Sequence, residues 1–128
     1  MYGPFDKQLE LRNVADGAEA ATAAETGISF AARMAGDFKA VVFVTALDLT
    51  SGNETYLLTV ETDSLAAFSD SPVEVGRASI DATGVYEIPL SAAAIEQRDP
   101  NAAAIRVKAT LGGTSPSITY GAYLVPAA

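Results

Sequence analysis

The feature that most constrains this chain is a regular alternation of apolar and polar residues near its C-terminus. From Ile105 to Leu111 every second residue is apolar, and the residues between them are Arg, Lys and Thr. Successive side chains of a β-strand point to opposite faces, so this pattern is typical of a strand with one buried side. After a turn over residues 112–116, apolar residues again recur at every second position from Ile118 to Leu124. Two strands joined by a turn are therefore predicted here.

Similar segments occur upstream. Residues 39–48 are apolar on both faces, which predicts a central strand. Residues 56–61 alternate, and because only a tight turn separates them from the first segment, the two are expected to form a hairpin. Shorter alternating segments follow at 73–77 and 86–88. Many short strands divided by turns predict an all-β fold, either a β-sandwich or a closed barrel.

Two segments are alanine-rich. Ala18 to Ala24 fits a short helix by propensity or an edge strand, and the nearby glycines and Thr22 favour the strand. Residues 91–97 better fit a helix of one or two turns that links two strands, because Ser91 can cap its start and Pro100 would prevent its continuation.

Composition limits the possible functions. The 128 residues suit one domain spanning 1–128, with 1–8 as a possible N-terminal arm. The chain contains no cysteine and no histidine, which excludes disulfides, thiolate metal sites and any catalytic arrangement built on histidine. Its net charge of −8 disfavours binding to nucleic acid or to anionic membranes. The start of the chain has no apolar segment typical of a signal peptide, so a soluble protein is expected.

The carboxylates offer only weak candidates for chemistry. Glu61 and Asp63 share a strand face by parity, as paired acids of a glycosidase would, but such pairs arise by chance in an acidic β protein. Asp48, Asn53 and Glu54 flank one turn and could bind calcium, although side chains bonding the backbone of their own turn are favoured. We therefore expect a protein that is not an enzyme and has no cofactor and no metal.

Aromatic residues give the candidate contact sites. Alternation places three tyrosines on inner faces, Tyr56, Tyr86 and Tyr120. Tyr123 has the opposite parity to Tyr120 and is expected to face outward beside Val125, where it would suit a contact with another subunit or packing against a second sheet or loop. Tyr2 and Phe5 precede any strand, and apolar residues on an arm need a surface that buries them. Tyr2, Phe5 and Tyr123 are the predicted subunit or capsid contacts.

Two segments resemble a known family. Gly84 to Ser91, and Ile105 to Val125 with its Gly-Gly-Thr turn and final Gly-Ala-Tyr-Leu-Val, resemble the end of the jelly-roll cement, or decoration, proteins of tailed bacteriophages. The arm and the Ala/Thr-rich segment before residues 40–47 are similar in layout. Residues 91–100 depart from the family, because they are longer and richer in alanine.

The resemblance implies a single-domain, jelly-roll-like β-sandwich with one short helical connection. It implies a homotrimer that lies on the outer surface of the virion, bridges subunits of the major capsid protein and stabilises the head. The chain would be synthesised in the host cytoplasm. The family has no active site. Two alternatives stay open: another phage structural β-sandwich of the tail or baseplate, and a carbohydrate-binding module.

Overall fold

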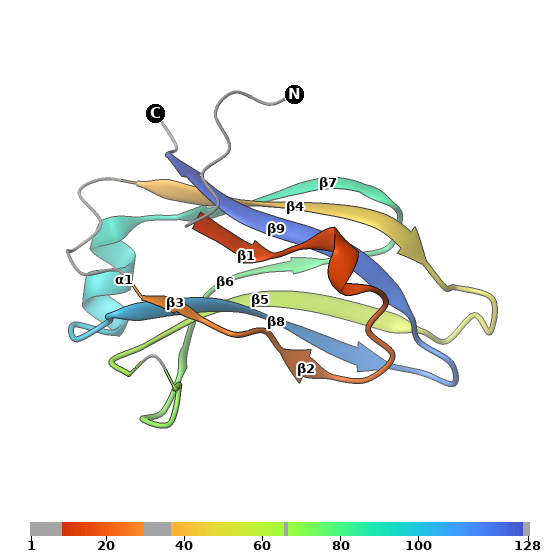
Figure 1. Ribbon diagram of the computed structural model, residues 1–128, viewed down its shortest axis with the longest axis horizontal. Helices are drawn as coiled ribbons and strands as arrows, with labels where there is room; N and C mark the ends of the chain where they lie inside the picture. Colours follow the sequence, from red (N-terminus) through yellow and green to blue (C-terminus); the bar gives the residue numbers. More distant parts are fainter. Residues whose placement is uncertain (1–8, 30–36, 66, 127–128) are drawn as a thin grey trace.

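Two antiparallel sheets packed face to face make up the protein (Figure 1). The computed structural model describes residues 9–29, 37–65 and 67–126. Sheet A has the strand order β1-β9-β4-β7, formed by Glu10–Arg12, Ile118–Pro126, Phe38–Leu47 and Gly84–Leu90. Sheet B has the order β2-β8-β5-β6, formed by Ala23–Ala24, Ala104–Gly112, Thr55–Asp63 and Val73–Ser79. The short β3, Ile28–Ser29, also pairs with β8, and a 3-10 turn, Val14–Asp16, follows β1.

Strand pairing is nested from the ends of the chain towards its middle. The first strand pairs with the last, β2 and β3 pair with β8, β4 pairs with β7, and β5 pairs with β6. This nesting is the strand order of a jelly roll, in which a long folded-over ribbon rolls into two sheets. The predicted all-β sandwich is therefore confirmed, and the open edges of both sheets exclude a closed barrel among the described residues.

Alternation decides which side chains fill the space between the sheets. The residues predicted for the inner face of the last strand are all buried, as are those of the strand before it up to Ala109. On β5 the alternating side chains of Tyr56, Leu58 and Val60 are at most 3% exposed. Burial of this apolar surface, at about 25 cal/mol per Å², is the main stabilising contribution to the fold.

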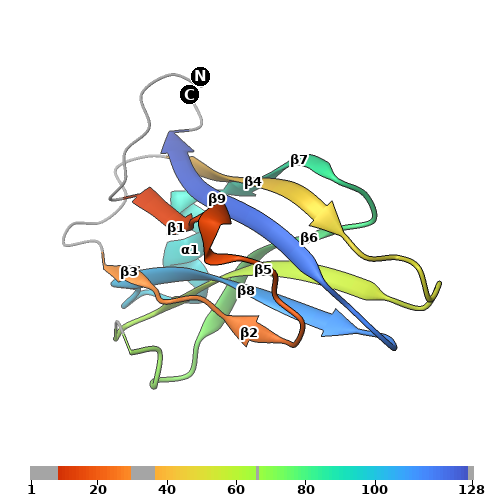
Figure 2. The same ribbon diagram turned by 45° about the vertical axis from the view of Figure 1, so that its right-hand side comes forward.

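The expected hairpin between residues 39–48 and 56–61 is wrong. The two segments form β4 and β5, which lie in different sheets, and the turn between them crosses from one sheet to the other (Figure 2). A short connection can join neighbouring strands of one sheet or arch between two packed sheets, and the local sequence does not distinguish these geometries. Pairing with β7 and β9 on either side places β4 inside its sheet, so its predicted central position is confirmed.

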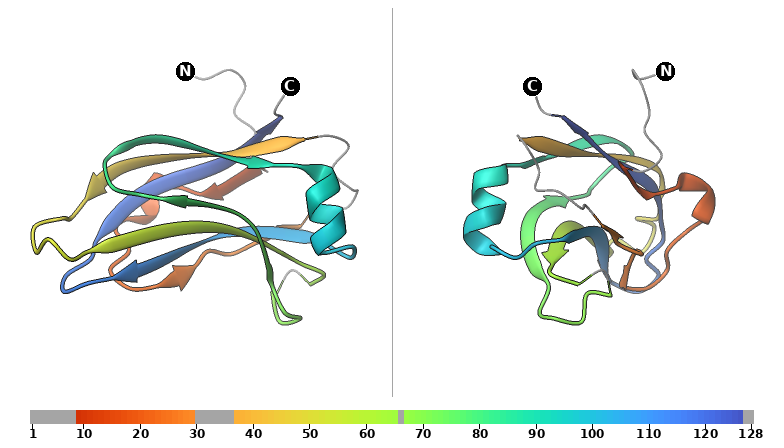
Figure 3. Two further views of the ribbon diagram at one scale, coloured as in Figure 1. Left: turned by 180° about the vertical axis from the view of Figure 1, so that it is seen from behind. Right: turned by 60° about the vertical axis from the view of Figure 1, so that its left-hand side comes forward.

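The predicted helical connection is present as α1, Ala92–Arg98, between β7 and β8. The Ser91 side chain accepts a hydrogen bond from Ala94 N, which caps the helix start as expected. Asp37 Oδ1 accepts a second bond, 3.2 Å from Ala92 N. Ile95 is buried, and the helix covers one end of the sandwich between the two layers (Figure 3).

The favoured interpretation of Ala18 to Ala24 as an edge strand is confirmed only for its last two residues, Ala23–Ala24, which form β2. Glu19 forms an isolated bridge with Ile118, and the two-residue β2 pairs with Lys108 and Ala109 at the edge of sheet B. The chain therefore crosses from the edge of sheet A to the edge of sheet B over residues 13–24, a stretch that we call the crossing segment.

Candidate functional site

The outer faces of the two sheets differ in chemistry. On sheet B, the outward side chains of β8 include Arg106 and Lys108, and Arg106 pairs with Glu61 at 2.8 Å. On sheet A, the outward side chains of the central strands are mainly apolar, and Val85 on β7 is 64% exposed. Exposed apolar patches are a common sign of an interaction surface.

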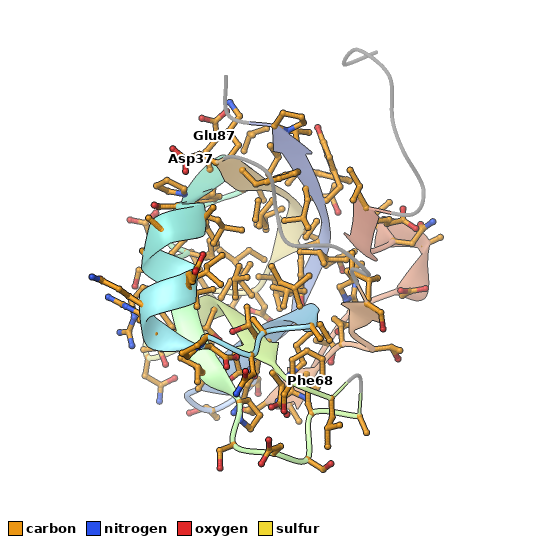
Figure 4. The ribbon with its side chains drawn as sticks, turned by 90° about the vertical axis from the view of Figure 1, so that its left-hand side faces the viewer. Asp37, Phe68 and Glu87 are labelled. Atoms are coloured by element: carbon orange, nitrogen blue, oxygen red, sulfur yellow. The ribbon has the colours of Figure 1, made fainter. Side chains whose placement is uncertain are left out.

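A groove of about 400 Å³ lies on this outer face of sheet A. Its walls come from β4, β7 and β9, and its apolar members are Val41, Phe43, Val85, Tyr123 and Val125. Lys39 and Glu87 complete the lining, which we call the apolar groove. Glu87 lies on the outside of sheet A, and the labelled Phe68 lies at the opposite side of the sandwich (Figure 4).

The aromatic side chains of the groove are held by the backbone beneath them. Phe43 and Gly121 are register partners on β4 and β9, and a Cβ at Gly121 would overlap the Phe43 ring. Only glycine therefore lets the ring lie against this strand. The rings of Phe43 and Tyr123 lie 6.1 Å apart at 57°, which is a favourable tilted arrangement. The groove thus has a defined aromatic surface.

The charged residues of the groove pair with each other. Lys39 Nζ lies 3.0 Å from Glu87 Oε2, and the side chains are 33% and 57% exposed. Such exposed pairs contribute little to stability, at most about 1 kcal/mol. Their effect on the groove is electrostatic: its lining has one positive and one negative charge, so it is locally neutral.

The strand edges are protected against pairing with other chains. Edge strand β7 contains Pro89, which has no N–H to donate. The edge strand β6 contains Arg77, whose guanidinium binds Glu74 at 2.7 Å. At the other edges, β1 has three residues and β2 and β3 have two each. These features disfavour the pairing of another chain with the strand edges.

A second polar feature lies between the sheets, and we call it the Arg12 cluster: Arg12, Glu19, Glu25 and Tyr120. Arg12 on β1 is 5% exposed, and its guanidinium lies 4.6 Å from the centre of the Tyr120 ring. One terminal nitrogen donates to Tyr120 O at 2.8 Å, and the other donates to Gly17 O and Glu19 Oε1. Its Nε lies 3.1 Å from Glu25 Oε2, although the N–H is too poorly aligned for a hydrogen bond.

Burial and crowding perturb the Arg12 cluster. Desolvation, followed by a hydrogen bond with Glu19, raises the pKa of Glu25 to about 6 despite the nearby Arg12. Desolvation, followed by the charge of Glu25, raises the pKa of Tyr120. The Tyr120 hydroxyl is buried without a hydrogen-bond partner among the described residues. The cluster ties the crossing segment to both sheets, which is a structural role.

The carboxylates considered for chemistry have structural partners. Asp48 Oδ1 accepts bonds from the backbone and hydroxyl of Thr50, and Glu54 accepts bonds from the turn backbone at Ser51 and Gly52. The favoured interpretation, turn residues bonding their own turn, is confirmed for these two. It is wrong for Asn53, whose side chain exchanges hydrogen bonds with Thr114 in the turn between β8 and β9. Asp63, which is 1% exposed, accepts bonds from the backbone of the loop that follows it.

The predicted contact residues have different outcomes. Tyr123 lines the apolar groove beside Val125, so its predicted outward orientation is confirmed, while its role in a contact stays a prediction. Tyr2, Phe5 and the arm at 1–8 lie outside the described residues. Tyr56 and Tyr120 are buried and Tyr86 packs against the core, as expected.

Sequence reasoning did not identify Phe43, Val85 or Arg12. A signal for Phe43 was present, because residues 39–48 are apolar on both faces and one of those faces remains uncovered by a second layer. Arg12 had no local signal, since its hydrogen-bond partners lie 5 to 108 positions away.

Comparison with protein-family models, with curated proteins and with solved structures finds no match of any of these kinds. No group of three or more metal-ligating side chains is found among the described residues. In the part of the chain that the structure describes, no helix has the length and apolar character needed to cross a membrane.

Proposed function

We propose that this chain is a structural protein of a virion, a cement protein that binds the outer capsid and stabilises the head without catalysing a reaction. The observation that carries the proposal is the apolar outer face of sheet A on an otherwise acidic β-sandwich with protected edges. A capsid-bound protein needs a rigid scaffold and complementary surfaces rather than nucleophiles.

The segments that resemble cement proteins support this proposal. They correspond to β7 and to the pair β8 and β9 with their turn, and these strands include part of the groove lining. The functional partner would be the major capsid protein, and three copies would associate into a homotrimer. Several attachment points on one lattice let weak individual contacts add up to durable binding.

Charge suggests how the trimer would meet the capsid. With 16 acidic and 8 basic residues, the chain would suit a basic patch on the lattice. Attachment that depends on such charges weakens as salt rises, because the Debye length falls from about 10 Å at 0.1 M to about 3 Å at 1 M. Attachment that is equally strong at both salt concentrations would contradict this charge-based part of the proposal.

The experiment is to locate the protein on purified virions of a phage that encodes it. Gold-labelled antibody should mark the heads, and mass spectrometry should find the chain in empty capsids freed of tails. Heads stripped of the protein should break at a lower temperature than intact heads, and adding back the purified protein should restore the difference. Label confined to tails or baseplates would support the alternative structural role, and its absence from virions would refute both.

A carbohydrate-binding module remains the second candidate, favoured by one observation. The half-buried rings of Phe43 and Tyr123 line a groove on the outer face of sheet A, and aromatic side chains also line many ligand sites. Against it, the rings are tilted by 57°, and only Lys39 and Glu87 add charged hydrogen-bonding groups to the groove. Calorimetric titration with soluble polysaccharides tests this candidate, and heat of binding that disappears in Tyr123→Ala would support it.

A further inference from the structure

We infer that the apolar groove is the surface through which copies of this chain associate with one another. The inference deepens the proposed function and rests on its homotrimer, but it concerns the free protein in solution and names the face in contact. Of the groove's apolar lining, Val85 is largely exposed, Phe43, Tyr123 and Val125 are half-buried, and Val41 is buried at 8% exposure.

The first step is electrostatic. Two copies that each have a net charge of −8 repel one another over most of their surfaces. The groove lining is an exception, because its only charged members are Lys39 and Glu87, which neutralise each other at 3.0 Å. A neutral surface is not repelled by an acidic neighbour, so like-charged copies can approach at the groove. In a closed trimer, the groove of each copy would contact a different surface of the next copy. A basic partner would gain more from the acidic surfaces elsewhere, whereas copies of this chain that associate find their least repulsive contact at the groove.

The strand edges disfavour the usual alternative for β proteins. Sheets often associate by adding one edge strand to another, which needs a long strand with free N–H and C=O groups. In the described residues, Pro89 limits the free edge of β7 to residues 84–88, a charged pair lies on β6, and the remaining edges are two or three residues long. Association is therefore expected through a face.

The area of the groove can be compared with that of a standard interface. Stable interfaces bury about 800 Å² on each partner, with aromatic residues enriched at the centre and a polar rim around it. The groove lining takes five residues of β4, 39–43, which extend about 16 Å, and its three strands span about 10 to 14 Å, so its projected area is about 200 Å². The groove thus suits the apolar centre of a standard interface, with residues around it supplying the rim.

Val85 is the most informative position. It is 64% exposed on the groove wall, so a polar side chain there keeps access to water in the monomer and leaves the core unchanged. In an interface the same side chain would have to be buried, and an unpaired buried charge strongly opposes association. Leu49 gives a matched control: it is a 45% exposed aliphatic residue outside the groove lining.

The experiment compares four full-length proteins by light scattering over a concentration series: wild type, Val85→Glu, Val85→Lys and Leu49→Glu. The wild type and Leu49→Glu should have a mass of about 40 kDa, three times the 13.2 kDa of one chain. Both Val85 variants should shift to 13.2 kDa at the same concentrations, with a dissociation constant raised at least tenfold. Unchanged circular dichroism and melting of the monomeric form show that the fold is intact.

The outcomes separate the inference from the proposed function. A wild type that is monomeric at every concentration, or an oligomer that persists in both Val85 variants, overturns the inference. A dimer that Val85→Glu dissociates supports the groove as the interface and contradicts only the homotrimer. Binding of the wild type to stripped heads is measured separately, so loss of head binding counts against the proposed function and leaves the contact face unaffected.

Discussion

The stability of this protein should increase as the pH falls from 7 to 5, and Glu25 should be a specific cause. Its carboxyl group lies in the Arg12 cluster, where its side chain is 15% exposed. Burial and the neighbouring Glu19 raise its pKa from 4.5 to about 6 in the folded chain. At a pH between 4.5 and about 6, Glu25 holds a proton in the folded state and releases it in the unfolded state. The contribution of Glu25 to the free energy of unfolding is therefore fully present below pH 4.5 and is lost as the pH rises through 6.

The magnitude follows from that difference in pKa. One pKa unit corresponds to about 1.4 kcal/mol, so the full contribution of Glu25 is about 2 kcal/mol. At pH 5 the unfolded carboxyl is already partly ionised while the folded one is mostly protonated. Lowering the pH from 7 to 5 should therefore add about 1 kcal/mol to the free energy of unfolding through this one group.

The assay is urea unfolding at pH 7, 6 and 5, with Glu25→Gln as the test variant. A glutamine side chain cannot titrate, so the variant should gain about 1 kcal/mol less than the wild type between pH 7 and pH 5. Acid also relieves the repulsion within a chain of net charge −8, and Glu96→Gln, at an exposed position on α1, controls for the loss of one carboxylate. If the curves for wild type and Glu25→Gln are parallel over this range, Glu25 does not hold the proton and the argument is refuted.

Three further substitutions test other parts of the fold by chemical unfolding. Gly121→Ala should lower the free energy of unfolding by about 1–2 kcal/mol, because the new methyl group displaces the Phe43 ring; no loss would mean that the ring moves freely. Tyr56→Phe should cost about 1–2 kcal/mol, since its hydroxyl bonds the backbone of two turns between the sheets, and an unchanged midpoint would contradict this. Phe68→Ala should cost about 3 kcal/mol, as the ring is 8% exposed and lies 4.3 Å from the Arg106 guanidinium; a much smaller loss would show that the loop does not anchor there.

Much of the strand structure could be predicted because it depends on local patterns. The alternation over 105–111 and 118–124 gave the inward residues of β8 and β9, and Ser91 gave the start of α1. The hairpin between residues 39–48 and 56–61 failed for a nonlocal reason. Their connecting turn joins different sheets, and only the pairing of β4 with β7 and β9, which are distant in sequence, decides this.

The candidate site was predicted only in part, for a similar reason. The alternation of side chains along β9 correctly predicted that Tyr123 points outward, because this prediction needs only the residues of one strand. The apolar run of β4 was interpreted as a strand in the middle of its sheet, and strands of this kind are commonly covered on both sides. Whether a layer covers the side with Val41 and Phe43 depends on the number and placement of all the other elements, which that run does not encode.

The strand β9 links the buried and exposed features of the protein. Its inward Tyr120 lies beneath the Arg12 guanidinium, while its outward Tyr123 lines the apolar groove three positions later. Because side chains alternate along a strand, a shift of one residue in its pairing with β4 would exchange the two faces and disrupt both features. Gly121 lies between them and is matched in register to Phe43. The residues that fix this register therefore also determine which aromatic side chains the protein offers to a partner.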